Sequence, residues 1–253
     1  MTCLVRAVQA EILKSKRTLM VALTFLAPLS MAFLEIAILF NVESIAFKQS
    51  QDTWITLINH ATQLWVLLLL PLFITLQMGL MGAMEHNNRA WKQLYTRPLP
   101  RWSIYMAKQL VGAGLIGLSS LILGLMIVGV GLVGQSFRPE LGFSAIIPWS
   151  YLWKAMFYPF LASWLIISIH TFVSLYSSSF VAAMGLGIVA TVFGVVVIGT
   201  KYEPYDPWIM PGVVAHNLAN NQSFLLPLVT GIVGGLIIAC LGCALTIRKD
   251  VLE

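Results

Sequence analysis

Three polar side chains inside long apolar runs are the residues of this sequence best placed to do chemistry. They are Glu35, Gln77 and His170. A titratable group in hydrocarbon is costly, so such residues are candidate contacts along a path for a substrate or for protons. Their alternative role is structural, as hydrogen-bond partners of neighbouring helices. A proton-coupled carrier usually needs a relay of carboxylates, and these runs hold one clear acid, Glu35.

Patterns that would support catalysis are missing from the sequence. There is no Ser-His-Asp arrangement, no paired carboxylates and no His/Cys/Asp/Glu spacing suited to a metal. The phosphate-binding pattern G-x-x-x-x-G-K-[ST] is also absent. We therefore expect no enzyme activity and no directly bound cofactor. If ATP drives the protein, another chain must bind the ATP and Mg²⁺.

Composition indicates the solvent in which this chain folds. Its 253 residues are 58% hydrophobic and 10% charged, with a mean hydropathy of +0.86. Soluble domains carry about 25% charged residues. A soluble enzyme, an extracellular disulfide module and a disordered regulator are excluded. The net charge of +5 comes without a dense basic patch, so we expect no nucleic-acid partner. The expected surroundings are the lipid bilayer.

Six continuous apolar runs are each long enough to cross a bilayer as a helix, which takes roughly 20 residues. Continuous rather than alternating apolar character excludes a β-barrel. We predict an all-α integral membrane protein, with one transmembrane domain over residues 1–253. The predicted spans are 19–42, 64–84, 110–134, 155–176, 180–200 and 224–247.

The distribution of basic residues predicts the orientation. Eleven of the fifteen Lys and Arg residues fall in segments on the same side as the two termini. Cytoplasmic segments carry the excess of Lys and Arg in membrane proteins. We therefore expect a multi-pass protein of the bacterial inner membrane with both termini in the cytoplasm.

Two cytoplasmic segments have helical patterns of their own. Residues 4–17 place Leu4, Val5, Val8 and Ile12 on one face, which predicts an amphipathic helix along the membrane surface. The loop that begins at Glu85 contains a second helical pattern. Its residues Trp91, Leu94 and Tyr95 form an apolar ridge, and Arg97-Pro98 ends the helix. This loop is either a docking element for a cytoplasmic partner or a basic connector held to anionic lipid.

These features together resemble the ABC-2 family of transporter permeases. The resemblance rests on the amino-terminal amphipathic helix, the six spans, the inner-loop motif W-K-x-L-x-x-x-P-L-P-R and the terminal R-K-D. The lantibiotic-immunity and bacitracin-resistance branch is the closer likeness. That branch typically reads Q-x-F-x-S-x-x-x-S-F near the fourth and fifth spans, and this chain has His170 in place of the Gln.

The resemblance implies a permease that pairs with a second permease, identical or related, on ABC ATP-binding subunits. It implies an exporter of amphipathic peptides, antibiotics or lipid-like molecules, with residues 4–17 as a connecting helix and 85–99 as a coupling helix. The ATPase-contacting residues it implies are Glu85, Trp91, Lys92, Leu94, Tyr95 and Arg97. Two other classes of function are an ion-coupled secondary transporter and an integral-membrane assembly factor, both working without an ATPase.

Overall fold

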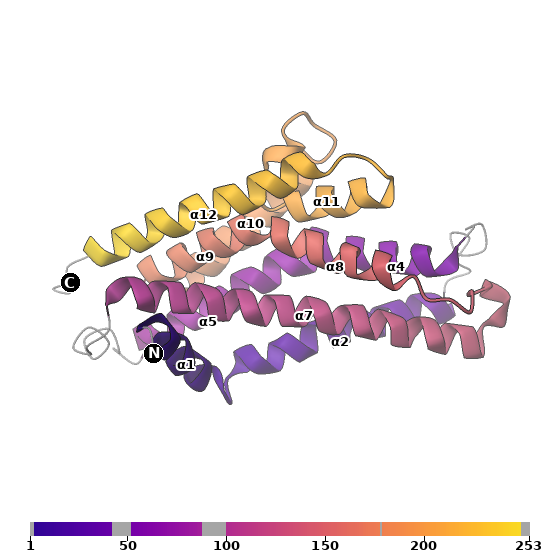
Figure 1. Cartoon of the computed structure of the whole chain (residues 1–253), viewed down its shortest axis with the longest axis horizontal. Helices are drawn as coiled ribbons and strands as arrows, with labels where there is room; N and C mark the ends of the chain where they lie inside the picture. The colour runs from indigo at the N-terminus through magenta and orange to yellow at the C-terminus, as the bar shows by residue number, and fades with distance from the viewer. Residues whose placement is uncertain (1–2, 42–51, 88–99, 178, 249–253) are drawn as a thin grey trace.

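A backbone in lipid must satisfy its own hydrogen bonds, and a helix does so within one segment. The computed structural model describes residues 3–41, 52–87, 100–177 and 179–248, and this part of the chain forms helices and turns without strands. The helices make an elongated bundle (Figure 1). Among these residues, five helices are long and apolar enough to span a membrane, and a bent helix pair gives a sixth span if the pair is counted as one. The predicted all-α fold is confirmed.

The elements follow one another along the chain in a simple order. Thirteen of them are described: α1 (Cys3–Ser15), α2 (Leu19–Asn41), α4 (Thr53–Leu64), the π-helical η1 (Trp65–Leu69), α5 (Leu70–Asn87), α7 (Arg101–Phe137), the 3-10 turn η2 (Pro139–Leu141), α8 (Trp149–Ala162), α9 (Trp164–Tyr176), α10 (Phe180–Val197), the 3-10 turn η3 (Glu203–Tyr205), α11 (Met210–Ala219) and α12 (Leu225–Arg248).

Different helix ends and hydrogen bonds lie at the two ends of the bundle. The amino-terminal helix α1 and the last turn of α12 lie at one end (Figure 1), where Arg101 Nη1 donates to the Ile247 carbonyl at 2.9 Å. We call this the terminal end. At the opposite, distal end, Arg138 Nη1 donates to the Leu39 carbonyl at 3.1 Å. Thr53 Oγ1 there donates to the Leu141 carbonyl at 2.6 Å.

The second span is longer than the sequence predicts. Its helix begins at Thr53 rather than near residue 64, because the Asp52 carboxylate accepts hydrogen bonds from the backbone N–H groups of Trp54 and Ile55. It then continues through η1 and α5 to Asn87. α4 carries a buried apolar stripe, which includes Trp54 and Leu57, and therefore packs into the core.

The third span also extends beyond its prediction. α7 runs for 37 residues and begins at Arg101, directly after Pro100 at the N-cap position. Proline has no N–H to donate, so the helix does not extend back through Pro100, and residues 101–109 form the first turns of α7.

The predicted continuous span 155–176 is wrong in one respect, because the structure breaks it. α8 and α9 meet at Ser163 with a bend of 42°. Pro159 lies inside α8 and supplies no N–H to the turn before it. The Ser163 N–H bonds to the carbonyls of both Pro159 and Phe160, which tightens the last turn of α8.

The last span, α12, covers this break. An ideal Cβ on Gly231 would lie 2.4 Å from the Ala162 carbonyl oxygen, and one on Gly235 would lie 2.5 Å from Cδ1 of Trp164. Nearer the carboxyl end of α12, an ideal Cβ on Gly242 would lie 2.2 Å from the Tyr105 hydroxyl oxygen. Glycines on α12 therefore allow close approach to the α8–α9 junction and to α7.

The segment 201–223, between the last two spans, partly enters the bundle. α10 ends before Gly199, whose φ of +78° is the left-handed conformation that glycine adopts most easily. After η3, the short helix α11 buries residues 210–215. α11 packs against α4, α8 and α12, so this connection belongs to the folded core.

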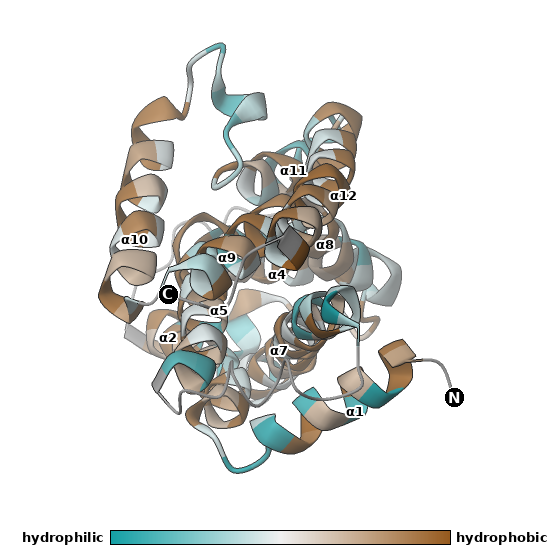
Figure 2. Cartoon of the chain, turned by 90° about the vertical axis from the view of Figure 1, so that its left-hand side faces the viewer, coloured by the Kyte–Doolittle hydropathy of each residue, from teal (hydrophilic) through white to brown (hydrophobic). Residues whose placement is uncertain are grey.

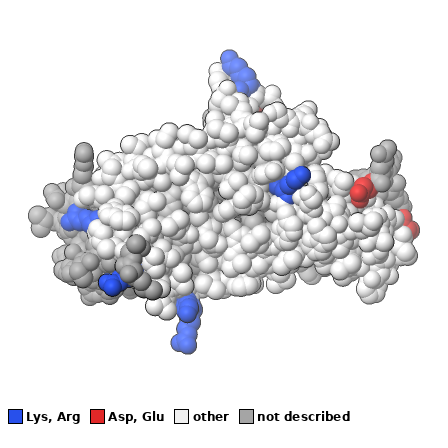
Figure 3. Space-filling model, in the orientation of Figure 1, with Lys and Arg blue, Asp and Glu red and all other residues white. Residues whose placement is uncertain are grey.

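The outer surface is suited to lipid. Seen along the bundle, apolar residues predominate on the spans (Figure 2). One broad face of the molecule is almost free of charge, and its charged side chains lie mainly at the ends or as isolated protrusions (Figure 3). Large apolar side chains on α10, such as Val189 and Phe193, are exposed in the single chain.

A glycine pair tests the packing of α12. Gly231→Ala should destabilise the protein by about 1–3 kcal/mol, because the new methyl group meets backbone atoms that cannot rotate away. Gly185→Ala in α10 is the matched control, since an ideal Cβ there meets nothing within 4 Å. Thermal stability in detergent, followed by fluorescence-detected size exclusion, compares the two. Equal stability of both variants would contradict this packing.

Candidate functional site

Four charged side chains form a buried network at the terminal end of the bundle. Lys108 Nζ donates to Glu11 Oε2 at 2.8 Å and to Glu85 Oε1 at 2.7 Å. Lys14 Nζ donates to Glu11 Oε1 at 2.9 Å and to Glu85 Oε1 at 2.8 Å. We call these residues the ion network. Two acids face two lysines, so the network is neutral as a whole.

Each member of the ion network comes from a helix whose local sequence brings it there. Ala7, Glu11 and Ser15 are spaced four apart and form the stripe of α1 that is buried. Glu85 lies near the end of α5, and Lys108 lies two turns into α7. The network therefore joins α1 to the two helices that flank residues 88–99.

Burial decides how strongly these contacts constrain the helices. The Lys108 side chain is 0% exposed, and Glu85 is 2% exposed. An ammonium ion removed from water is very unfavourable unless carboxylates compensate it closely. Moving either α1 or α5 away from α7 would therefore leave the buried Lys108 ammonium without one of its two carboxylates.

Lys14 is the member of the ion network nearest to solvent, with 32% of its side chain exposed. Burial by itself lowers the pKa of Lys14. The hydrogen bonds to Glu85 and Glu11, with the attraction of both carboxylates, outweigh that effect and raise the pKa above its ordinary value. Lys14 is consequently charged at neutral pH.

Gln77 makes a second connection near the terminal end. Its Nε2 donates to the Met20 carbonyl and to Thr24 Oγ1, both at 3.0 Å. Gln77 thus ties α5 to the first turns of α2, directly after the α1–α2 turn. Its Oε1 is buried without a hydrogen-bond partner in the described residues.

Glu35 has a partner of its own on another helix. Its carboxylate lies 3.0 and 3.1 Å from Nδ1 of His60 on α4. Glu35 is 1% exposed, whereas the His60 side chain is 42% exposed. The longer α4 explains this pairing, because it carries His60 to the level of Glu35.

His170 lies where α5, α9 and α10 cross. Its Nε2 is 3.2 Å from Thr75 Oγ1, and that hydroxyl donates to the Pro71 carbonyl at 2.9 Å. A Cβ on Gly187 would lie 2.2 Å from the same hydroxyl oxygen, which shows how tightly the three helices pack.

The three polar candidates of the spans therefore do not share a site. Glu35 bonds to His60, Gln77 to the start of α2, and His170 to Thr75. The described residues also contain no group of three His, Cys, Asp or Glu side chains that could hold a metal ion. A polar relay through the bundle has no support in these contacts.

The predicted coupling residues divide into two sets. Glu85 is described and is buried in the ion network rather than on the surface. The others lie outside the described residues: Trp91, Lys92, Leu94, Tyr95 and Arg97. Sequence reasoning missed Glu11 and Lys108 as functional residues. One sequence pattern could have pointed to Glu11: it is spaced four residues from both Ala7 and Ser15, so it lies on the same helix face as two small residues.

Removing the charge of Lys108 tests the ion network. Lys108→Met keeps the length of the side chain but leaves two buried carboxylates facing Lys14 alone. We expect a loss of about 3–5 kcal/mol in the free energy of unfolding, measured by titration with SDS in mixed micelles. The double variant Lys108→Met/Glu85→Gln should recover part of this loss, because one uncompensated carboxylate is gone.

The control for this prediction is Lys201→Met, which changes an exposed lysine. Surface substitutions usually change stability by no more than about 0.5 kcal/mol. A Lys108→Met variant as stable as this control, or a double variant less stable than Lys108→Met alone, would contradict the network.

Comparison with known proteins gives one result. A family model described as "ABC-2 family transporter protein" matches residues 7–194, which is most of the chain and includes all four residues of the ion network. No curated protein and no solved structure gives a significant match.

Proposed function

Since this chain belongs to the ABC-2 family of transporter proteins, we propose that it is the permease subunit of an ATP-driven exporter. The family supports a membrane permease, an ATPase on a separate subunit and, typically, a second permease. In this proposal ATP and Mg²⁺ bind to the partner subunit. The bilayer supplies the surroundings for the spans.

The ion network is the observation that carries the mechanism. It fixes α1 to the end of α5 and the start of α7, which are the two helices that flank residues 88–99. A push on that loop by a partner reaches α1, α5 and α7 together, because none of them can leave the network without exposing an uncompensated charge. The loop and its supports therefore suit the transmission of force from an ATPase to the spans.

Residues of the loop make the contacts with the ATPase in this mechanism. Trp91, Leu94 and Tyr95 provide an apolar ridge, and Lys92 and Arg97 provide charge at its edge. Glu85 has a different role from a surface contact: bonded to Lys14 and Lys108, it positions the base of the loop.

We assign the substrate to amphipathic molecules taken from the bilayer, such as peptides, antibiotics or lipid-like compounds. The polar side chains of the spans that could serve a proton relay bond instead to their neighbours, as Glu35 does to His60. This favours an exporter driven by ATP over an ion-coupled carrier. Immunity to lantibiotics or resistance to bacitracin is the role that the resemblance to that branch favours.

The proposed orientation places the terminal end in the cytoplasm, with the protein in the bacterial inner membrane. The described Lys and Arg residues of α1, of the turn after it and of the first turns of α7 lie at this end of the spans, and the positive-inside rule places such residues in the cytoplasm. The loop that contacts the ATPase then faces the compartment that contains ATP.

Cysteine labelling tests this orientation. In a chain whose native cysteines are replaced by Ser, Tyr202→Cys should react with a membrane-impermeant maleimide in intact spheroplasts. Tyr202 is suitable because its side chain is 61% exposed. Lys249→Cys should react only after the membrane is permeabilised. The reverse pattern would overturn the orientation.

Co-purification tests the coupling loop. Trp91→Ala should weaken ATPase binding by about 2 kcal/mol, or roughly thirty-fold, because a packed Trp is a common interface hot spot. Lys92→Ala, at the polar edge, should have a smaller effect that fades at high salt. The measurement is the amount of ATP-binding subunit retained at matched permease levels.

Substrate-stimulated ATP hydrolysis is the second measurement for these variants. Neither change should alter membrane insertion, since both lie outside the predicted spans. A Trp91→Ala permease that keeps its full complement of ATPase and normal stimulated turnover would show the loop to be a connector. Export that persists without any ATPase but collapses with the proton gradient would favour the ion-coupled carrier.

A further inference from the structure

The amino-terminal helix α1 has a second face that the ion network leaves free. While Ala7, Glu11 and Ser15 are buried, the apolar residues Val5, Ile12 and Leu13 are exposed, with Leu13 at 63%. Figure 2 shows α1 along the edge of the bundle, with apolar and polar residues side by side. Soluble surfaces rarely carry such a stripe together with a buried acid, so the exposed face needs a partner of its own.

The charge on this exposed face is of one sign. Glu11, the acid of α1, is turned inward and neutralised in the ion network. The outward cations are Arg6, Lys16 and Arg17, and none of them has an ion-pair partner among the described residues. Because Glu11 is paired on the inner side, the charges on the exposed face of α1 and on the following turn are all positive.

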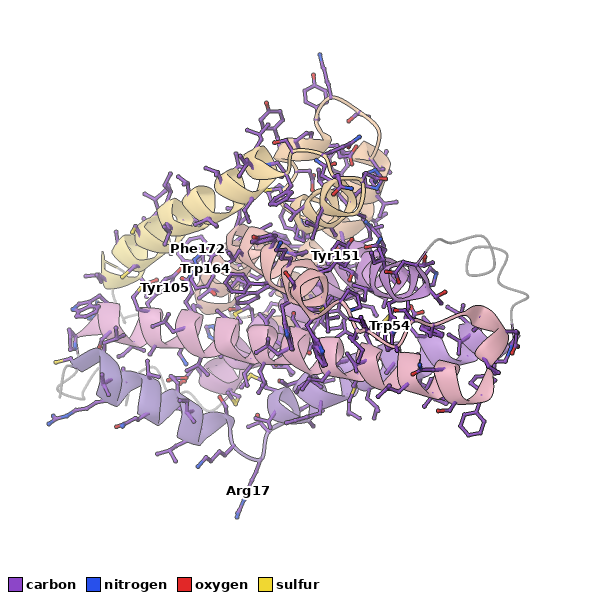
Figure 4. All side chains as sticks on the ribbon, turned by 45° about the vertical axis from the view of Figure 1, so that its right-hand side comes forward. Arg17, Trp54, Tyr105, Tyr151, Trp164 and Phe172 are labelled. Carbon is purple, nitrogen blue, oxygen red and sulfur yellow. The ribbon has the colours of Figure 1, made fainter. Side chains whose placement is uncertain are left out.

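Arg17 is held outward by an unusual backbone. Its φ of +63° places it in the left-handed conformation, in the turn between α1 and α2. Its side chain points away from the bundle (Figure 4). Basic side chains also protrude from the lower edge of the molecule in Figure 3. Arg17 thus extends sideways from the bundle.

The apolar surface of α1 is continuous with the lipid-facing surface of the spans. Leu19, at the start of α2, is exposed, and so are Leu26 and Phe33 further along the same helix. Apolar side chains beside outward cations at the end of a span are the pattern of a helix lying among lipid headgroups. A protein partner would have to cover cations that project sideways, where the membrane lies.

We propose that this surface of α1 and the α1–α2 turn binds anionic phospholipid headgroups. Lys16 and Arg17 bind the phosphate, and Leu13 and Ile12 contact the upper acyl chains. Arg6 extends the basic surface about three helical turns toward the amino terminus of α1. Each basic residue near an anionic membrane strengthens binding about five-fold, so the Lys16–Arg17 pair contributes about twenty-five-fold. Because α1 also carries Glu11, the lipid acts on the helix that the ion network ties to α5 and α7.

The test uses the purified full-length chain in detergent without any ATPase, so it is independent of the proposed ATP-driven export. The probes are phosphatidylglycerol and phosphatidylcholine with identical acyl chains, and the readout is bound lipid by native mass spectrometry. The variant is Lys16→Gln/Arg17→Gly. Glycine accepts the left-handed backbone without strain, so this change removes charge while keeping the turn. The control is Lys201→Gln, an exposed cation elsewhere on the chain.

We expect the wild-type chain to prefer phosphatidylglycerol and the double variant to lose about twenty-five-fold in affinity for it. Binding of phosphatidylcholine should not change, and Lys201→Gln should behave as wild type. Unchanged phosphatidylglycerol binding by the double variant would overturn the proposal. So would equal competition by free glycerol phosphate, which would mean a simple anion site. A loss of ATPase co-purification with lipid binding intact would instead assign this face to the ATPase.

Discussion

The ammonium group of Lys108 has no access to solvent and lies at hydrogen-bond distance from two carboxylates, which compensate its charge. Those carboxylates come from α1 and α5, which are far apart in sequence from each other. Because separating any one helix leaves a buried charge uncompensated, the three helices behave as one unit at the terminal end. Gln77 extends this unit to α2 through its bonds to Met20 and Thr24. The arrangement makes the helix that lies outside the spans an integral part of the bundle.

The helical type of the spans could be predicted because it depends on a local property, the length of an apolar run, and the five to six candidate spans of the described residues agree with it. The ends of the helices depend on other residues. Asp52 caps α4, and Pro100 precedes α7, so both helices extend into mixed polar and apolar sequence beyond the continuous apolar runs. The bend at Ser163 was missed because Pro159 is compatible with an apolar span and its effect depends on the neighbours that accept a kink.

The candidate site was less predictable because its contacts are distant in sequence. Glu11 and Lys108 are 97 residues apart, and nothing in either local sequence indicates the other. Their positions near span ends made both look like ordinary solvated charges. Glu35 shows the same limitation: its partner His60 lies on a helix that begins earlier than predicted. Isolated acids and bases can be found in a sequence, but their pairing follows from how the helices extend and pack.

The packing of α12 over the α8–α9 break bears on the order in which the chain is made. The break at Ser163 and its neighbour Trp164 are synthesised well before Gly231 and Gly235, which pack against them. Until α12 leaves the ribosome and enters the membrane, the bent span has no cover on that side. The fourth span must therefore wait in the bilayer, or beside the insertion machinery, in a less constrained form. A chain cut short before α12 would keep the bend that Pro159 and Ser163 set locally, but it would carry the break uncovered.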